Sequence, residues 1–256
     1  MARKFFFFDI DGTLLDFEKK LPDSTIEAVA RLKQAGHSVA ISTGRGPFMF
    51  QKIREELNID SFVSYNGQFV VYEDKVIYEN PIKIEALEDL VQAAKNANFP
   101  LVFMSDDEMR ANTKDHPYIH ESLASLQLTH PEYEPEYYRE KMIYQALLFC
   151  KEGEEEQFNQ REDIKFVRWH DLSTDVLPNG GSKAEGIKKM IEMAGFRRDE
   201  VVAFGDGLND IEMIEYAGTG VAMGNAVEDV KQLADFITKP VDDDGIYHAV
   251  KQLGFL

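Results

Sequence analysis

FFFFDIDGT, residues 5–13, is the stretch that decides the fold. The four phenylalanines form a short apolar run, which predicts a buried strand, and Gly12 marks a sharp turn of the backbone. Asp9 and Asp11 then lie at the carboxyl end of that strand, where α/β enzymes place their chemistry. The negative charges of two carboxylates beside so much buried aromatic surface must be compensated. A divalent cation, which binds oxygen ligands, is the natural candidate for this role. The same residues are also consistent with an ordinary capped turn.

Length and charge limit the class of protein. The chain has 256 residues, enough for one large or two modest domains, and its 44% hydrophobic and 29% charged residues are typical of a soluble globular protein. The net charge of -18 argues against a nucleic acid or a membrane as the partner, because both bind basic surfaces. A small anionic substrate remains compatible with this charge if a metal ion or local basic side chains reverse the potential at the site.

The start of the chain and its single cysteine carry little further signal. The apolar run at residues 5–8 is too short for a signal peptide or a membrane span, so we expect a cytoplasmic protein. Cys150 ends the apolar run 144–150, and we expect it to be a small buried strand residue rather than a catalytic thiol.

Four histidines fall in the middle of the chain, at positions 116, 120, 130 and 170. Their spacing matches no zinc motif, except that His116 and His120 stand at i and i+4, which recurs often by chance. The pattern therefore favours surface or core histidines over metal ligands.

The first third of the chain alternates strands and helices. Ser24-Thr25-Ile26-Glu27 has the pattern of a capping box, which predicts the start of a helix that ends at Gly36. A strand at 37–42, a helix to about residue 57, a strand at 62–64 and a hairpin of 69–72 with 76–78 follow. This order predicts an α/β fold with a doubly wound parallel sheet.

The alternation of strands and helices stops between residues 82 and 178 and resumes afterwards. The middle segment predicts strands at 101–104, 145–150, 166–170 and 175–177, with helices at 85–96 and 154–161, so we expect an inserted α+β domain with an antiparallel sheet. From 179 onward the segment predicts helices at 184–194, 211–216 and 227–234, strands at 201–204, 220–223 and 236–238, and a last helix from Gly245. One α/β domain, 1–81 plus 179–256, is thus split by an insertion at 82–178.

Polar residues follow the strands of this α/β domain. Asp9, Thr43 and Asp206 each stand just after a predicted strand, and Lys183 stands just before a helix. Parallel strand ends converge on one crevice, where several carboxylates would repel one another without a cation. Mg²⁺ takes carboxylate oxygens and bridges readily to phosphate, so the arrangement predicts phosphoryl transfer to a carboxylate.

A phosphate cradle is expected beside the carboxylates. Thr43 and the backbone N–H groups of Gly44 and Arg45 stand at a helix start, which favours anion binding. Lys183 adds a positive charge that screens the nucleophile and the phosphoryl oxygens.

Four motifs in order carry a resemblance to a known family. They are Asp9-Ile-Asp11-Gly-Thr13, Ile41-Ser-Thr43-Gly-Arg45, Gly181-Ser-Lys183 and Gly205-Asp206-Gly-Leu-Asn209-Asp210. Together they resemble the haloacid dehalogenase (HAD) superfamily, and Ser64-Tyr-Asn66-Gly67 with Val221-Ala-Met-Gly224-Asn225-Ala226 is similar to its Cof-type phosphatases with a type IIB cap. The resemblance implies a Rossmann-like HAD core with the cap inserted between the second and third motifs.

The resemblance also implies roles for single residues. Asp9 would be the nucleophile that forms an aspartyl-phosphate and binds Mg²⁺. Asp11 would be the general acid and then the base, with its backbone carbonyl on the metal. Thr43 would hydrogen-bond the phosphoryl group, together with Gly44, and Lys183 would stabilise its charge.

The remaining implied roles concern the metal and the substrate side. Asp206 would be a direct Mg²⁺ ligand, and Asn209 and Asp210 would order metal-bound waters or Lys183. Arg45 and Asn66 would approach the substrate side of the phosphate. Asp210 has a second interpretation as the cap of the helix that starts at residue 211, and the two roles can coexist.

These observations predict a Mg²⁺-dependent phosphatase that hydrolyses small phosphorylated metabolites, with sugar phosphates as the first expectation. Nucleotides, flavin mononucleotide and pyridoxal phosphate are competing substrates, and the cap residues that choose among them are open, as is the oligomeric state. A phosphomutase with the same chemistry and a non-catalytic regulator that binds Mg²⁺ or a metabolite are the alternative functions.

Overall fold

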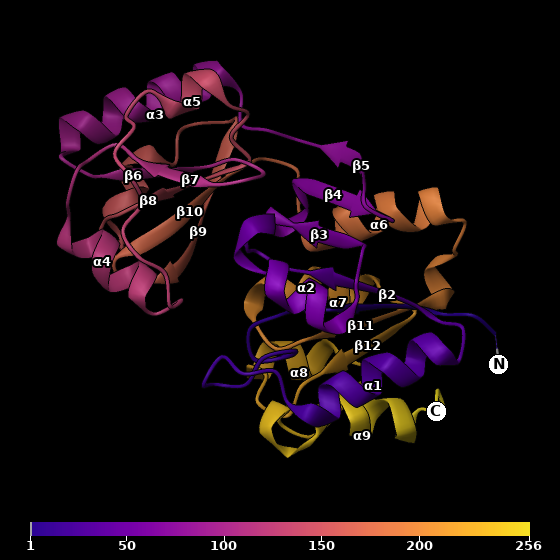
Figure 1. The fold of residues 1–256 in the computed structure, drawn as a ribbon. Helices are drawn as coiled ribbons and strands as arrows, with labels where there is room; N and C mark the ends of the chain where they lie inside the picture. Colours follow the sequence, from indigo (N-terminus) through magenta and orange to yellow (C-terminus); the bar gives the residue numbers. More distant parts are fainter. Residues whose placement is uncertain (1) are drawn as a thin grey trace. The chain divides into compact units, whose positions relative to one another are not determined.

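The computed structural model describes residues 2–256, and these residues form two compact units (Figure 1). Of the described residues, the core unit contains 2–45, 49–78 and 182–256, and the inserted unit contains 79–181 with the short segment 46–48. Assignment of these units as a catalytic core and a cap stays a prediction. The predicted fold class, a doubly wound α/β core with an α+β insertion, is confirmed.

An eight-stranded sheet organises the core unit, in the order β13-β12-β11-β1-β2-β3-β4-β5. The pairings from β13 to β3 are parallel, whereas β4 runs antiparallel to β3. The strands are β1 Phe5–Phe8, β2 Ser38–Ser42, β3 Phe62–Ser64, β4 Phe69–Tyr72, β5 Lys75–Glu79, β11 Val201–Gly205, β12 Thr219–Ala222 and β13 Phe236–Ile237.

Strand β1 lies in the interior of this sheet, between β11 and β2, and all four of its phenylalanines are buried. Side chains alternate between the two faces of a strand. Phe5 and Phe7, with ring centroids 4.5 Å apart, belong to one hydrophobic cluster. On the other face, Phe6 lies 5.0 Å from the ring of Phe255. Residues apolar on both faces thus fit a strand covered by helices on both sides.

Helices flank the core sheet (Figure 1). They are α1 Asp23–Gln34, α2 Gln51–Leu57, α6 Lys183–Ala194, α7 Ile211–Tyr216, α8 Glu228–Leu233 and α9 Gly245–Gln252. The predicted capping box at the start of α1 is wrong. Pro22 is the N-cap and makes no side-chain cap bond, and Ser24 lies one residue inside the helix. Proline fixes φ near the helical value, and with Pro22 as the N-cap the helix starts two residues earlier than a Ser24 cap would allow.

A five-stranded antiparallel sheet, β7-β6-β8-β10-β9, forms the inserted unit. Its strands and helices are α3 Ile84–Ala97, β6 Leu101–Met104, β7 Met109–Ala111, α4 Pro117–Ala124, α5 Tyr137–Glu140, β8 Gln145–Leu148, β9 Ile164–His170 and β10 Ser173–Pro178. The sequence missed β7, α4 and α5, which are short. Residues 154–158 form a 3-10 helix where a longer helix was expected.

Two further expectations concern the role of Cys150 and membrane-spanning segments. Cys150 is a buried free cysteine, and burial raises the pKa of its thiol, as suits a structural residue. Within residues 2–256, none of the helices has the length and the apolar character needed to cross a membrane.

Candidate active site

The candidate site lies at the carboxyl ends of adjacent parallel strands of the core unit. Strand β1 pairs with β11 on one side and β2 on the other. Asp9 follows β1, Thr43 follows β2 and Asp206 follows β11, so these side chains share one edge of the sheet. The sheet topology therefore brings together residues that are more than 160 positions apart in the chain.

A buried ion-pair triad forms the centre of the site. The Lys183 Nζ atom, at the start of α6, donates to Asp9 Oδ1 at 2.6 Å and to Asp210 Oδ1 at 2.5 Å. Lys183 and Asp210 are 0% exposed and Asp9 is 6% exposed, so water screens these charges little. Two carboxylates face one ammonium, so the triad carries an excess negative charge when both carboxylates are ionised.

Burial also perturbs the pKa values of the triad. Desolvation raises the pKa of Asp9 to about 8, against the opposing effect of Lys183, and repulsion from Asp210 adds to the rise. For Lys183, burial opposes the charged form, but attraction to Asp210 and Asp9 outweighs it and raises the pKa. Lys183 is therefore a permanent cation, and a second cation would favour the ionised form of Asp9.

The loop after β11 fixes the position of Asp210. Its Oδ2 atom accepts hydrogen bonds from the backbone N–H groups of Asp206 and Gly207, each at 2.9 Å. Asp210 is the N-cap residue of α7 but makes no side-chain cap bond to that helix. The second interpretation of Asp210, as the cap of this helix, is therefore confirmed for its position but not for a side-chain cap bond. Both carboxylate oxygens instead hold the loop and Lys183.

One group of carboxylates in the core unit suits a metal ion. Asp9, Asp206 and Asp210 each offer an oxygen, and these atoms lie within 4.8 Å of one another. Burial and repulsion from Asp210 raise the pKa of Asp206 to about 7. Oxygen donors and an excess of negative charge fit a hard cation such as Mg²⁺. Asp210 is the weakest member, because its oxygens already accept hydrogen bonds.

The Asp11 carboxylate lies outside this group. Arg45 binds it with two hydrogen bonds, Nε to Oδ2 at 2.8 Å and Nη2 to Oδ1 at 2.7 Å, and Lys19 Nζ donates to Oδ1 at 2.7 Å. Burial opposes ionisation of Asp11, but the hydrogen bonds and charges of Arg45 and Lys19 lower its pKa. The sequence analysis missed Lys19, because no motif spacing indicates that its side chain turns back to Asp11.

The predicted phosphate cradle precedes the helix instead of standing at its start, because a 3-10 helix begins at Pro47 and α2 begins only at Gln51. The Thr43 Oγ1 atom accepts a hydrogen bond from the Arg45 N–H at 3.1 Å, and the Thr43 carbonyl accepts one from the Asn66 N–H at 3.0 Å. A Cβ at Gly44 would lie 3.0 Å from Asn66 Nδ2. The Asn66 side chain accepts from Asn209 Nδ2 at 3.1 Å, so Asn209 contacts the cradle rather than a carboxylate.

Asn225 contacts the loops of the site, although its motif in the sequence indicated no role for it. Its Nδ2 atom donates to the Gly12 carbonyl at 2.8 Å and to Asp206 Oδ2 at 3.3 Å. Its Oδ1 atom accepts from the Val241 N–H at 2.9 Å. Asn225 thereby ties the loop after β1 to the loop after β11. Hydrogen bonds between residues so far apart in the chain leave no periodic pattern in the sequence, so this role could not be predicted.

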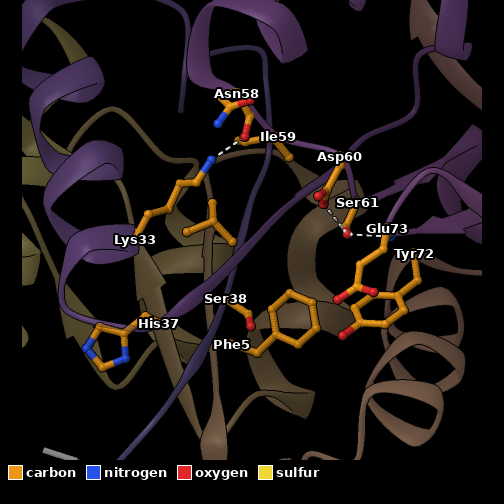
Figure 2. Close-up of a pocket in the computed structure, with 11 residues that line it drawn as sticks. Phe5, Lys33, His37, Ser38, Asn58, Ile59, Asp60, Ser61, Tyr72 and Glu73 are labelled. Atoms are coloured by element: carbon orange, nitrogen blue, oxygen red, sulfur yellow. Dashed lines mark hydrogen bonds between the residues drawn. The ribbon is translucent and has the colours of Figure 1, made fainter.

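A pocket of about 220 Å³ lies at the other end of the core strands (Figure 2). Phe5 and Ser38, which begin β1 and β2, line it, together with Lys33 and Glu73. Phe5 precedes Asp9 by four residues, so the pocket lies roughly 13 Å from the carboxylates along the strand. It is therefore separate from the candidate active site.

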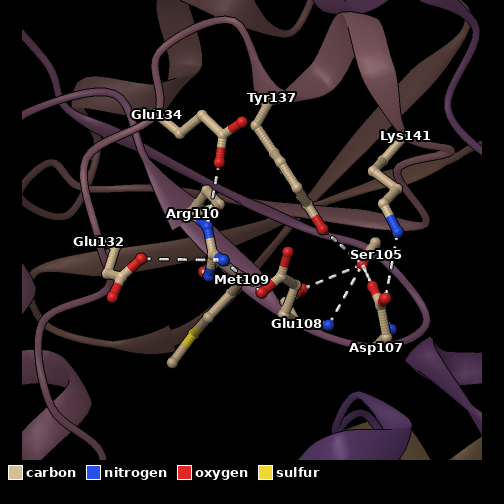
Figure 3. A network of polar contacts seen from close by, with 9 residues as sticks. All are labelled: Ser105, Asp107, Glu108, Met109, Arg110, Glu132, Glu134, Tyr137 and Lys141. Carbon is tan, nitrogen blue, oxygen red and sulfur yellow. Dashed lines mark hydrogen bonds and ion pairs between the residues drawn. The ribbon is translucent and has the colours of Figure 1, made fainter.

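Arg110 is a partly buried basic residue of strand β7. In the inserted unit it forms ion pairs with Glu108, with Glu134 at 3.1 Å and with Glu132 at 3.9 Å (Figure 3). Its guanidinium also lies 5.7 Å from the centre of the Tyr137 ring. Three carboxylates exceed its single charge, so this region offers a phosphate group no net positive charge.

Comparison with protein families gives a match over nearly the whole chain. Residues 6–250 match the model of the haloacid dehalogenase-like hydrolases, Hydrolase_3. YkrA of Bacillus subtilis (strain 168), which bears the name "Putative phosphatase YkrA", is 54% identical over 256 residues, covering 100% of both chains.

Solved structures agree with this match. A hypothetical protein from Geobacillus kaustophilus HTA426 is 59% identical with a TM-score of 0.96, covering 100% of both chains. The HAD subclass IIB sugar phosphatase BT4131 is 32% identical with a TM-score of 0.87, covering 99% of this chain and 100% of that one. The match extends over both the core unit and the inserted unit.

Proposed function

Because the chain belongs to the haloacid dehalogenase superfamily and is a phosphoric monoester hydrolase, we propose that it releases phosphate from small phosphorylated metabolites through an aspartyl-phosphate on Asp9. The observation that carries this proposal is the buried triad of Asp9, Lys183 and Asp210 beside Asp206. A carboxylate held next to a permanent cation, in a site with little water, is suited to attack an anionic phosphoryl group.

The proposed reaction has two steps. In the first, an Asp9 oxygen forms a bond to phosphorus, the ester P–O bond breaks, and Asp11 gives a proton to the departing alcohol. In the second, Asp11 takes a proton from water, the water oxygen attacks phosphorus, and phosphate leaves with Asp9 restored. Asp9, Asp206 and Asp210, with the Asp11 carbonyl, would hold Mg²⁺, which would neutralise charge on the phosphoryl oxygens.

Asp11 must carry a proton in the first step, and its ion pairs oppose this. Arg45 and Lys19 lower its pKa. We therefore propose that the Arg45 side chain leaves Asp11 and binds the incoming phosphate. Loss of the guanidinium from Asp11 raises its pKa and allows it to act as an acid. Thr43 and the Gly44 N–H then bind the phosphoryl oxygens, and the Arg45 N–H joins them by exchanging Thr43 Oγ1 for the phosphate.

Sugar phosphates are the substrate class that we propose. The support is the likeness over the whole chain, inserted unit included, to a sugar phosphatase of HAD subclass IIB. Nucleotides, flavin mononucleotide and pyridoxal phosphate are the competing classes. Phosphate release across a panel of these esters decides among them, and analysis of the organic product with hexose 1-phosphates separates hydrolysis from a mutase reaction.

The first test is hydrolysis of p-nitrophenyl phosphate by the purified protein. We expect phosphate release that requires Mg²⁺, stops with EDTA and returns when Mg²⁺ is restored. Asp9→Asn is expected to lower the rate by at least about a thousandfold, because it removes the nucleophile. Asp229→Asn, an exposed aspartate of α8, is the matched control and should retain the wild-type rate. Persistent activity in Asp9→Asn would refute the proposal.

A further inference from the structure

A second group of side chains with metal-ligand character lies in the inserted unit. Asp115 precedes α4, His120 lies within α4, and His130 lies in the segment that follows it. One ligand atom from each of the three residues lies within 4.8 Å of the others. None of them belongs to the candidate active site, which is built from residues of the core unit.

The tautomer of His130 leaves one nitrogen available as a ligand. The Nδ1 atom lies 2.8 Å from the carbonyl oxygen of Pro131, which can only accept, so Nδ1 carries the proton. In the neutral imidazole, which is the form that binds metals, the Nε2 atom therefore has a free lone pair. It is buried and has no hydrogen-bond partner among residues 2–256. Metal-bound histidines typically have this arrangement, in which a backbone carbonyl fixes the second nitrogen.

Asp115 and His120 complete the group. The His120 Nε2 atom lies 2.6 Å from Asp115 Oδ1, and the His120 and His130 rings are 4.9 Å apart between centroids. An ordinary ion pair accounts for Asp115 and His120, but it leaves the buried His130 nitrogen unsatisfied. An unsatisfied buried polar atom has a free-energy cost, and a cation shared by all three groups removes it.

His116 is not a member of the group. Its Nδ1 atom accepts a hydrogen bond from the Tyr118 N–H at 3.2 Å and so caps the start of α4. The two histidines of the group are therefore His120 and His130. They differ from the pair at i and i+4, His116 and His120, whose spacing alone among the four histidines resembles a zinc motif.

We propose that Asp115, His120 and His130 bind a divalent transition-metal ion of the Zn²⁺ class, with water completing the coordination. Two imidazoles and one carboxylate suit Zn²⁺, Ni²⁺ or Co²⁺, whereas Mg²⁺ prefers oxygen donors alone. Such an ion joins α4 to the segment after it, two parts of the inserted unit that are ten residues apart at His120 and His130. The role that this predicts is local stabilisation of the inserted unit, independent of the phosphatase reaction.

Zinc binding by the untagged protein tests this proposal. The protein is first freed of metal with a chelator and then titrated with Zn²⁺ against a chromophoric zinc indicator, in a large excess of Mg²⁺ that occupies the oxygen site. We expect one equivalent of Zn²⁺ to bind and the midpoint of thermal unfolding to rise, because a ligand of the folded state stabilises it. Co²⁺ in place of Zn²⁺ should give the visible absorption of a site with nitrogen ligands.

Variants identify the ligands. His120→Gln and His130→Gln should each weaken Zn²⁺ binding at least about tenfold. His120 is exposed, so its variant is expected to fold even if His130→Gln does not. His116→Asn keeps a residue suited to the N-cap and is the matched control, which should bind Zn²⁺ like the wild type. The proposal is wrong if wild-type protein in excess Mg²⁺ binds no zinc, or if His120→Gln binds it unchanged.

Discussion

Gly12 shows at the residue scale how tightly the loops of the site are packed. It has a φ of +76°, and a Cβ built there would lie 2.2 Å from Asp206 Oδ2. Any side chain must therefore displace the Asp206 carboxylate, in addition to the strain of a left-handed backbone. The glycine of the first motif is thus required by the position of an aspartate almost two hundred residues away.

A Gly12→Ala substitution should affect both stability and activity. We expect a loss of about 1–3 kcal/mol in unfolding free energy and at least about a tenfold fall in phosphate release, because Asp206 moves. Gly195→Ala is the matched control, since Gly195 has a φ of +73° with nothing within 4 Å. It should show the stability loss alone, by chemical denaturation, with the rate unchanged. Equal rates in the two variants would contradict this account.

Lys183 contributes to the fold as well as to the site. It is fully buried between Asp9 and Asp210, so Lys183→Met leaves two carboxylates without their cation. We expect a loss of about 3–5 kcal/mol in unfolding free energy in EDTA, and no measurable phosphatase activity. Lys188→Met, on the outer part of the same helix, is the control and should lose less than about 1 kcal/mol. Retained activity in Lys183→Met would refute the role given to Lys183.

Sequence patterns identified the residues of the site better than their partners. Asp9, Thr43, Lys183 and Asp206 could be named because strand ends and motif spacing place backbones. The ion pair of Lys19 with Asp11 could not, because a pattern does not specify where a long side chain points. The roles given to these residues remain proposals.

At the scale of elements, strands were predicted more reliably than short helices. The apolar run of β1 and the run before Cys150 contain enough buried side chains to define a strand alone. Helix α5 has four residues and α4 has eight, which is too short for a helical period to stand out. The start of α1 was misassigned because a proline can begin a helix without a side-chain cap.

Strand β10 carries a buried carboxyl group that predicts a pH effect on stability. Asp175 is 8% exposed, and its Oδ1 atom accepts a hydrogen bond from Gln145 Nε2 at 2.9 Å. Burial raises its pKa well above the usual 3.8. The folded state therefore holds a proton that the unfolded state releases, and this group lowers the stability as the pH rises above about 4, up to its folded-state pKa.

Asp175→Asn removes this titration and keeps the shape of the side chain. We expect the variant to match the wild type near pH 4 and to be the more stable of the two at pH 8, measured by chemical denaturation at each pH. Asp171→Asn, in the exposed turn before β10, is the control and should follow the wild-type pH profile. A wild-type profile for Asp175→Asn would show that Asp175 does not titrate as described.

At the scale of the whole molecule, a net charge of -18 coexists with a site for an anionic substrate. The core unit reduces this conflict locally, with Lys183, Arg45 and Lys19 next to its carboxylates, and a bound divalent cation would offset the remaining negative charge. The order of motifs along the chain was sufficient to predict the family and the split α/β core. The residues that select a substrate were not predictable, because they depend on side-chain positions in an insertion that carries none of the quoted motifs.

The central claim is that Asp9 becomes phosphorylated, and burst kinetics of Asp11→Asn test it most directly. p-Nitrophenolate leaves without a proton, so this variant can still complete the first step, whereas the second step lacks its base. We predict a burst of one p-nitrophenolate per protein molecule, a near halt, and phosphate on Asp9 in mass spectra of the peptides. The absence of a burst, or phosphate on another residue, would contradict the account.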